Sequence, residues 1–520
     1  MIRKSLLSPV VGTTAPGSAA RTEPSVATSA ARLLARREVL KLGMLLSASP
    51  IALLRPAYGA DEPDPHTPER ALPTQAAQHI LEYGGEIALH LGQAGAAHTG
   101  TYVGGRQFVV IDADLRVTAT TPPSRQVRDH NSGALVWQSG MEKIETLDHL
   151  TSGRGQVFHG FDEHQYGGSG ASYGHDRNID PGATGAALEI TRPCVLIKAN
   201  TGPRTHGPNG RSPQHQMAAV HFVASIPPEG ALPPPIGAPA QISRYLRDDI
   251  DFSVLPRLSA IPGAEDPEEL YERVQRFNHM QMRGRPRGEA FTNASSIFHG
   301  YGSNAAARTV SAQYAMCCDL GGREEDFAIQ FVIMAQDILE AAKAGMRFNP
   351  NRGLGGLWPG YKLILLIGAK LTQDAEMYAY ADPQAHPIWA EDTQTLYITQ
   401  DIIDMPGTDF IQADLGMPEY IQNSQRALNS ASRKTSAGYR GVFRRHQFGQ
   451  SAIAHILGLT EAWKNDAFFD YCDRCARGRF FSDSDAVTEY WLTVGRANFP
   501  SEFHQDLYNT YVSPRWSWPA

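Results

Sequence analysis

The feature that most constrains the fold is a change of hydrophobic period at a proline-rich segment, residues 226–240. Before it, short apolar runs such as 107–112 and 115–120, separated by glycine-rich connectors, are typical of strands. After it, apolar residues recur every three to four positions, as they do on one face of a helix. The pattern predicts an α+β protein in which a β-rich, sandwich-like domain precedes a helical one.

The helical part carries clear local signals. Asp266 is an expected N-cap, Pro267 takes the first helical position, and Glu269 follows the cap by three residues. The run 323–345 is apolar on a wide face, which predicts a helix buried around much of its circumference. Repeated helices joined by Gly- and Pro-rich connectors favour an (α/α)-toroid-like domain whose connectors form one rim. The expected parts are a β-rich domain at 77–226, a Pro-rich linker at 227–243 and a helical toroid-like domain at 244–520.

The first sixty residues are typical of a twin-arginine export signal. Arg36 and Arg37 precede a mildly apolar stretch, 42–54, and small residues follow at 57–60. Residues 61–76 form an expected linker. No later run reaches the ~18 apolar residues of a membrane helix. We therefore expect a periplasmic or secreted protein without membrane attachment after cleavage; an amphipathic helix that stays attached is the alternative.

The charge and the cysteines of the chain argue against nucleic-acid-binding, disulfide-rich and zinc-binding proteins. The net charge is −7 and no basic block follows the leader, so a nucleic-acid partner is not expected. The five cysteines do not form a disulfide framework. Cys472 and Cys475 lack two further ligands at zinc spacing, so structural thiols are preferred. No cofactor is predicted, and motifs of serine hydrolases, nucleotide-binding proteins and zincins are missing.

Residues 298–304 place a histidine, a tyrosine and an asparagine on a glycine-rich turn before a helix. His299 and Tyr301 are side chains that move a proton alpha to a carboxylate, and Asn304 is one that holds the acid. The alternative is that Asn304 caps the helix and His299 is a surface residue.

Residues 436–446 form a cationic cluster in an acidic chain. Tyr439 lies beside Arg440, and Arg444 and His446 follow on the same expected helix. Guanidinium groups bind carboxylates or sulfates bidentately, as an anionic polysaccharide would require. Solvated surface charge is the alternative.

Residues 389–397 carry adjacent acids, Glu391 and Asp392, followed by Gln394 and Tyr397. Burial would raise the pKa of one acid until it serves as a general acid or base. Adjacent side chains usually point apart, so at most one is central. A charge pair at a helix N-terminus is the alternative.

Two further stretches are candidates. Trp358, with Asn351 and Arg352, forms a possible stacking platform for a sugar ring, or else a core plug. The His-rich loop 158–176 matches no metal motif; we expect it to fold over the mouth of the site, and a structural metal remains the alternative.

Across roughly 300–480 the chain resembles a family of secreted bacterial proteins, many without assigned function, found in polysaccharide-degrading bacteria. The resemblance rests on 357–359, 391–397, 436–440 and 455–473. More broadly, helical hairpins with a β-sandwich resemble the alginate, heparin and chondroitin lyases. The resemblance implies an (α/α)-toroid and an anionic glycan substrate.

The first hypothesis is a polysaccharide lyase that cleaves a uronic-acid-containing glycan by β-elimination. Tyr439 or Tyr301 would move the proton, and His299 or His446 would assist. Asn304 and Arg440 would neutralise the carboxylate, while the remaining candidates (Trp358, Arg352, Asn351, Gln394, Tyr397 and Arg444) would bind substrate. A glycoside hydrolase using Glu391 or Asp392 is the second hypothesis, and a non-catalytic glycan-binding protein is the third.

Overall fold

The structure is a computed structural model of the 520-residue chain. The residues that it describes all lie in one compact unit, Pro63–Ala520. They are 78–83, 87–92, 98–121, 123, 126–128, 135–137, 139–145, 179–201, 214–277, 281–282, 291–292, 302–345, 347–348, 359–406, 408, 410–420, 437–476 and 501–512. The predicted export signal, the linker 61–76 and the loop 158–176 lie outside them.

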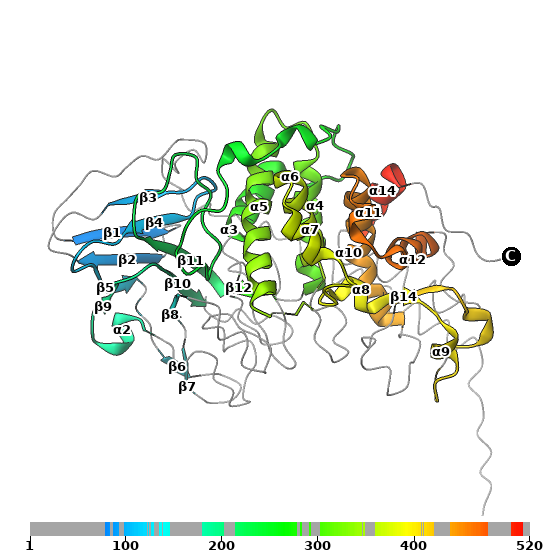
Figure 1. Ribbon diagram of the computed structural model, residues 1–520, viewed down its shortest axis with the longest axis horizontal. Coiled ribbons are helices and arrows are strands. Elements are labelled where there is room, and N and C mark those ends of the chain that lie inside the picture. Colours follow the sequence, from blue (N-terminus) through cyan, green and yellow to red (C-terminus); the bar gives the residue numbers. More distant parts are fainter. Residues whose placement is uncertain are drawn as a thin grey trace, which may run out of the picture. The chain divides into compact units, whose positions relative to one another are not determined.

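The N-terminal strands form two larger sheets (Figure 1). The first has the order β1 (Gln78–Tyr83), β2 (Ile87–Gly92), β5 (Arg116–Thr121) and β9 (Leu188–Glu189). The second has the order β3 (Thr99–Thr101), β4 (Gln107–Val110), β11 (Gln214–Val223), β10 (Cys194–Thr201) and β8 (Ser139–Ile144). All pairings in these sheets are antiparallel except β4 with β11. A small separate pair joins β6 (Gln126–Arg128) to β7 (Leu135–Trp137), and the short helix α2 (Pro181–Thr184) lies against β5.

Side chains of both sheets share one hydrophobic core. Leu89 and Val117 come from the first sheet, and Val109, Leu196 and Phe222 come from the second. The apolar runs 107–112 and 115–120 are therefore confirmed as strands, β4 and β5, which contribute Val109 and Val117 to this core.

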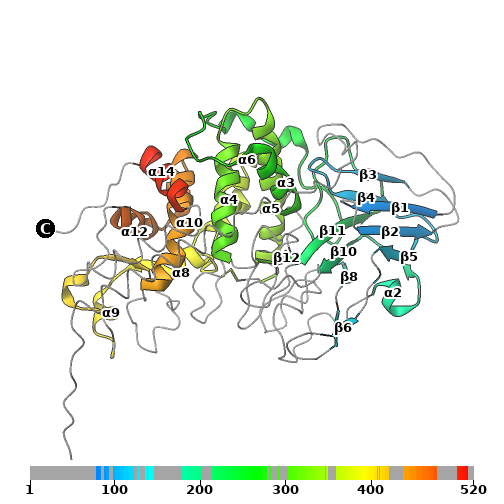
Figure 2. The same cartoon turned by 180° about the vertical axis from the view of Figure 1, so that it is seen from behind.

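The rest of the chain is mainly helical, which confirms the α+β prediction. The helices are α3 (Pro267–Phe277), α4 (Gly302–Met316), α5 (Arg323–Lys343), α6 (Tyr361–Thr372), α7 (Ala375–Ala381), α8 (Ala390–Gln394), α9 (Gln400–Ile403), α10 (Ala437–Ile456), α11 (Thr460–Trp463), α12 (Asp466–Ala476) and α14 (Ser501–Tyr511). Two small hairpins join β12 (Gln281–Met282) to β13 (Phe291–Thr292) and β14 (Thr395–Tyr397) to β15 (Pro418–Tyr420). Figures 1 and 2 show α4, α5 and α6 side by side, in agreement with their packing.

The described helices do not form the predicted toroid. A toroid repeats hairpins of similar length, whereas α5 has 21 residues and α8 has 5. The β14–β15 hairpin also interrupts the helical succession. The local predictions are better: the Asp266 carboxylate accepts the backbone N–H groups of Glu268 and Glu269 at 2.9 and 3.1 Å, as an N-cap does.

A β-hairpin turn joins the strands to the helical core. The Arg106 guanidinium, between β3 and β4, forms a buried ion pair with Asp337 of α5 at 2.5 Å. The other Asp337 oxygen accepts the backbone N–H of Ile236 at 2.8 Å, and the Gln330 amide donates to the Gly104 carbonyl at 3.1 Å. Residues 231–237 are buried, so the part of the chain predicted as a linker is packed against this junction.

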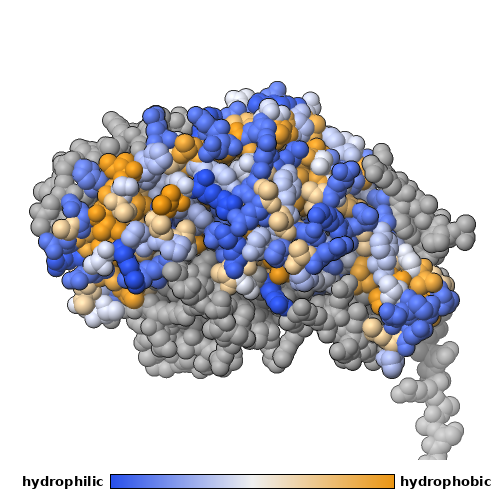
Figure 3. Space-filling view, in the orientation of Figure 1, coloured by the Kyte–Doolittle hydropathy of each residue, from blue (hydrophilic) through white to orange (hydrophobic). Residues whose placement is uncertain are grey.

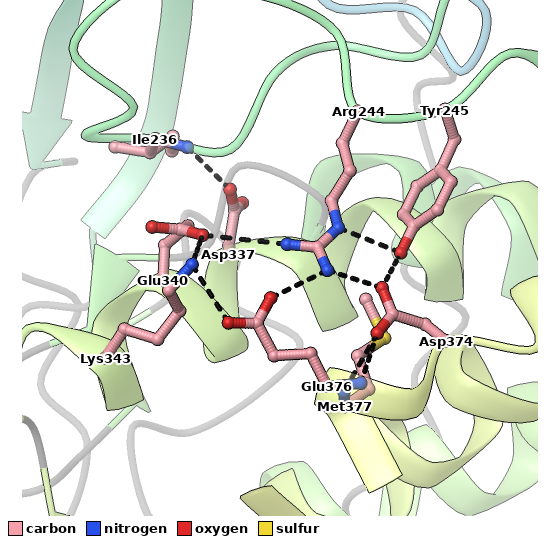
Figure 4. Close-up of polar contacts among 9 residues, drawn as sticks. All are labelled: Ile236, Arg244, Tyr245, Asp337, Glu340, Lys343, Asp374, Glu376 and Met377. Carbon is pink, nitrogen blue, oxygen red and sulfur yellow. Dashed lines mark hydrogen bonds and ion pairs between the residues drawn. The ribbon is translucent and has the colours of Figure 1, made fainter. Parts of the chain in front are cut away.

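Figure 4 shows how the next residues are held to the helices. The Arg244 guanidinium contacts the carboxylates of Asp374 and Glu376 at 2.6 and 2.8 Å, and the Tyr245 hydroxyl also donates to Asp374. Lys343 of α5 reaches Glu376 of α7 at 3.2 Å. This network is partly exposed, so it fixes the path of the chain more than it stabilises the fold.

We expect Gly104→Ala to lower the free energy of unfolding by about 1–3 kcal/mol. Gly104 has φ of 92°, and a Cβ there would lie 2.4 Å from Ile333 Cδ1 in the packed core. Gly345→Ala is the matched control, because Gly345 has φ of 91° but no atom within 4 Å of the added carbon. Denaturant unfolding measures both. Equal losses would show that the hairpin contact has no packing role.

The surface of the described residues is mixed (Figure 3). The large hydrophobic side chains exposed on it are Ile226, Ile242, Tyr397, Ile411 and Leu415. Among the described helices, none combines the length and apolar character that crossing a bilayer requires. The five cysteines are all buried, and no disulfide joins them.

Candidate active site

The predicted site residues divide into three groups. His299, Tyr301, Asn351, Arg352 and Trp358 lie outside the described residues. Asn304 falls in α4, and Tyr439, Arg440 and Arg444 fall in α10, but only their backbone is described. The side chains of the other five predicted residues are described: Glu391, Asp392, Gln394, Tyr397 and His446.

A buried tryptophan fixes the start of α8. Trp389 stacks on Phe348 with ring centroids 4.9 Å apart, and its indole N–H donates to the Tyr380 carbonyl at 2.8 Å. The bulky side chain leaves the next residues little freedom. Glu391 and Asp392 are consequently held in the interior rather than on a solvated helix end.

Glu391 is held through one carboxylate oxygen. Its Oε1 accepts the Gly360 backbone N–H at 2.6 Å and the Gln450 side-chain amide at 3.1 Å. Its Oε2 is buried and has no hydrogen-bond partner among the described residues. Burial raises the pKa of Glu391, and the nearby Asp392 charge adds to this effect, whereas the two hydrogen bonds oppose it. Since Oε1 already accepts two hydrogen bonds, Oε2 is the favoured place for the proton whenever Glu391 is protonated.

Asp392 has a different environment. Lys362 of α6 contacts its two oxygens at 2.8 and 2.7 Å, and the Asn465 amide donates to one of them at 3.2 Å. The Lys362 ammonium also donates to the Trp463 carbonyl at 2.6 Å and lies 5.1 Å from the centroid of that indole. Burial raises the pKa of Asp392, while the Lys362 charge opposes the rise. Asp392 therefore joins α6, α8 and α11, and Glu391 is the acid that keeps an open oxygen.

His446 belongs to the same buried network. Its Nδ1 lies 2.8 Å from Gln450 Oε1, and the side chain is fully buried. Burial lowers the pKa of His446 to about 3, and the neighbouring His504 lowers it further while the bond to Gln450 opposes the change. The imidazole is neutral at pH 7 and available as a base rather than as a cation.

Four helices meet at Glu391. Gly360 precedes α6 with φ of 102°, and a Cβ there would lie 3.0 Å from Ala306 Cβ in α4 and 3.9 Å from the Gln450 amide in α10. Gly360 therefore has no room for a side chain, which lets its N–H approach Glu391. In the sequence, Ala306 follows Asn304 by two residues and Gly360 follows Trp358 by two. Gly360 thus lies between Ala306 of α4 and the Glu391 carboxylate.

The two remaining predicted residues are Tyr397 and Gln394, and Tyr397 contacts α12. The Tyr397 hydroxyl donates to Asp470 at 2.5 Å, which occupies the group predicted to contact a sugar. Gln394 is buried. Gly360, Lys362 and Gln450 were not among the predicted residues. Lys362 had a visible signal, because it is the lone charged residue in the apolar run 361–369.

No cluster of three or more His, Cys, Asp or Glu side chains able to hold a metal ion occurs within the described ranges. Comparison of the chain with family models, curated proteins and solved structures finds no match.

Proposed function

We propose that the protein is an exported carbohydrate-active enzyme that cleaves a uronic-acid-containing glycan by β-elimination. Its β-sandwich-like domain precedes the helical region that carries the site, and residues 1–60 direct it to the periplasm or outside through the twin-arginine route. The observation that carries the proposal is the buried Glu391 of α8, which is held by Gly360 at the start of α6 and by Gln450 of α10 through Oε1, while its Oε2 has no hydrogen-bond partner among the described residues.

β-Elimination is assisted by hydrogen-bond donors or cations beside the substrate carboxylate. The donor stabilises the negative charge that develops when the carbon next to the carboxylate loses its proton. A carboxylic acid kept neutral by burial is one such donor. In the proposed reaction, Glu391 donates through Oε2 to the uronate, together with Asn304 and Arg440.

The remaining steps remove a proton from the substrate carbon and add a proton to the leaving oxygen. Tyr439 or Tyr301, assisted by His299 or His446, takes the proton from the carbon next to the carboxylate. The electron pair forms a carbon–carbon double bond, the bond to the glycosidic oxygen breaks, and that oxygen accepts a proton. Trp358, Arg352 and Arg444 would contact neighbouring sugar units.

Hydrolysis is the second candidate, because the raised pKa of Glu391 also suits a general acid. A hydrolase needs a second carboxylate across the scissile bond. The carboxylate next to Glu391 is Asp392, whose oxygens are both engaged by Lys362. The geometry therefore favours elimination over hydrolysis.

The direct test incubates the protein with alginate, pectate, hyaluronan and chondroitin, with dextran as the uncharged control. Elimination gives new reducing ends together with the ultraviolet absorbance of an unsaturated uronide. Reducing ends without that absorbance would indicate hydrolysis. Binding without cleavage would leave a glycan-binding protein, and neither binding nor cleavage would refute the proposal.

Substitutions at Glu391 separate the two reactions on an active substrate. Glu391→Gln keeps a hydrogen-bond donor but has no proton to transfer, so an elimination rate within about tenfold of the wild type is expected. A hydrolase would lose about 10²–10⁴-fold. Glu391→Leu removes the donor and should abolish both. Tyr439→Phe should abolish elimination and spare hydrolysis.

A further inference from the structure

One buried amide connects the two groups that the site offers for proton transfer. Gln450 of α10 is 1% exposed, and its two ends face different partners. Its Nε2 lies 3.1 Å from Glu391 Oε1, and its Oε1 lies 2.8 Å from His446 Nδ1. Since an amide has one donor end and one acceptor end, its orientation determines the hydrogens of both neighbours.

The orientation is fixed by a third group. The Gly360 backbone N–H points at Glu391 Oε1 from 2.6 Å, so this oxygen is an acceptor. A flipped amide would place a carbonyl oxygen against Oε1, and these two atoms would repel each other unless Oε1 carried the proton. A proton on Oε1 would make that oxygen a weaker acceptor for the Gly360 N–H at 2.6 Å, so this arrangement is disfavoured. The amide therefore donates to Glu391 and accepts from His446.

We propose that Gln450 is the positioning residue of the active site, which keeps the Glu391 proton on Oε2 and holds His446 as the Nδ1–H tautomer. Glu391 is then a donor through Oε2, and His446 is an acceptor through Nε2. Gln450 itself does not touch the substrate. The assignment deepens the proposed function, because it states which group gives a proton and which accepts one. The hydrogen-bond pattern can nevertheless be tested without any activity.

The surroundings are consistent with two neutral groups. Among the described residues, the charges that face Glu391 are those of Asp392 and its partner Lys362, which largely offset each other at 2.7 Å. The titratable group that faces His446 from α14 is His504. A cationic His446 would lie in an apolar interior beside another imidazole, which burial disfavours.

The structural test measures the tautomer of His446 by ¹⁵N nuclear magnetic resonance in histidine-labelled full-length protein. The signal is assigned by its loss in His446→Asn. We expect protonated Nδ1 and bare Nε2 at pH 7 in the wild type. Gln450→Met keeps the volume but removes both hydrogen bonds, so it should shift His446 toward the Nε2–H tautomer.

Gln447→Met is the matched control, because Gln447 is buried one turn earlier on the same helix and its amide nitrogen has no hydrogen-bond partner among the described residues. It should leave the His446 signal unchanged. A wild-type His446 protonated on Nε2, or an unchanged tautomer in Gln450→Met, would overturn the proposal. Should Gln450→Met fail to fold, the wild-type tautomer alone still decides.

The catalytic consequence is measured on a uronate glycan. Gln450→Met should lower kcat by about 10–10²-fold with KM within about twofold, and it should alter the pH profile of kcat, whereas Gln447→Met should do neither. A changed tautomer with unchanged kcat would reduce Gln450 to a structural residue. If the wild type cleaves no glycan, the proposed function fails while the tautomer measurement still tests the hydrogen-bond pattern.

Discussion

Lys362→Met is expected to lower the free energy of unfolding by about 3–5 kcal/mol, because it leaves a buried carboxylate without its cation. Both Lys362 and Asp392 are buried, and their contacts at 2.7 and 2.8 Å leave little room for water. Methionine matches the stem of lysine in volume, so the loss reports the charge rather than a cavity. Of the described side chains that donate to Asp392, the Asn465 amide would remain.

Equilibrium denaturation measures this loss, and two controls define its origin. Lys362→Met with Asp392→Leu replaces the ion pair by apolar groups, and most of the stability should return. Lys370→Met removes a half-buried lysine on the same helix, α6, and should cost at most about 0.5 kcal/mol. An equally unstable double variant would show that packing, rather than charge, causes the loss.

Acidification from pH 6.5 to 4.5 is expected to remove about 2–3 kcal/mol of stability through His221 alone. Burial, together with the nearby Arg106 charge, lowers the pKa of His221 from 6.5 to about 3, although the bond to Gln241 opposes the shift. A depressed pKa in the folded state means that the unfolded chain binds the proton first. This contribution is therefore complete above pH 6.5 and is lost as the pH falls toward 3.

The measurement compares His221→Asn with the wild type across this range. His221 Nδ1 lies 2.7 Å from Gln241 Oε1, and asparagine can donate the same hydrogen bond without titrating. The ring also meets Tyr102 edge-on at 5.5 Å, so the variant loses some packing at every pH. The packing loss is the same at every pH. The wild type also loses stability on acidification, so its advantage over His221→Asn should shrink as the pH falls. Parallel stability curves would contradict the prediction.

The fold class was predictable because it depends on local periodicity. Strand runs such as 115–120 and the capped start of α3 at Asp266 were identified from neighbours in the sequence, and both are confirmed. No toroid is detected among the described helices, since the arrangement of helices depends on packing between distant residues. The segment 227–243 was read as a linker from its prolines, yet residues 231–237 are buried in the structure.

The candidate site was only partly predictable for the same reason. The sequence indicated that at most one of Glu391 and Asp392 could be central, but it could not select between them. The selection depends on Lys362, 30 residues from Asp392, and on Gly360 and Gln450, which lie 31 and 59 residues from Glu391. No local pattern reports such contacts, which exist only once α6, α8 and α10 have packed.

The ion pair between Arg106 and Asp337 also limits whether the strand region and the helical region could fold as separate proteins. Dividing the chain at the proline-rich stretch would leave Asp337 as a lone anion inside an apolar helix bundle, with the Ile236 N–H as its remaining donor. A strand module borrowed from another protein would have to supply a cation at the same place. The helical part thus depends on the N-terminal strands for folding.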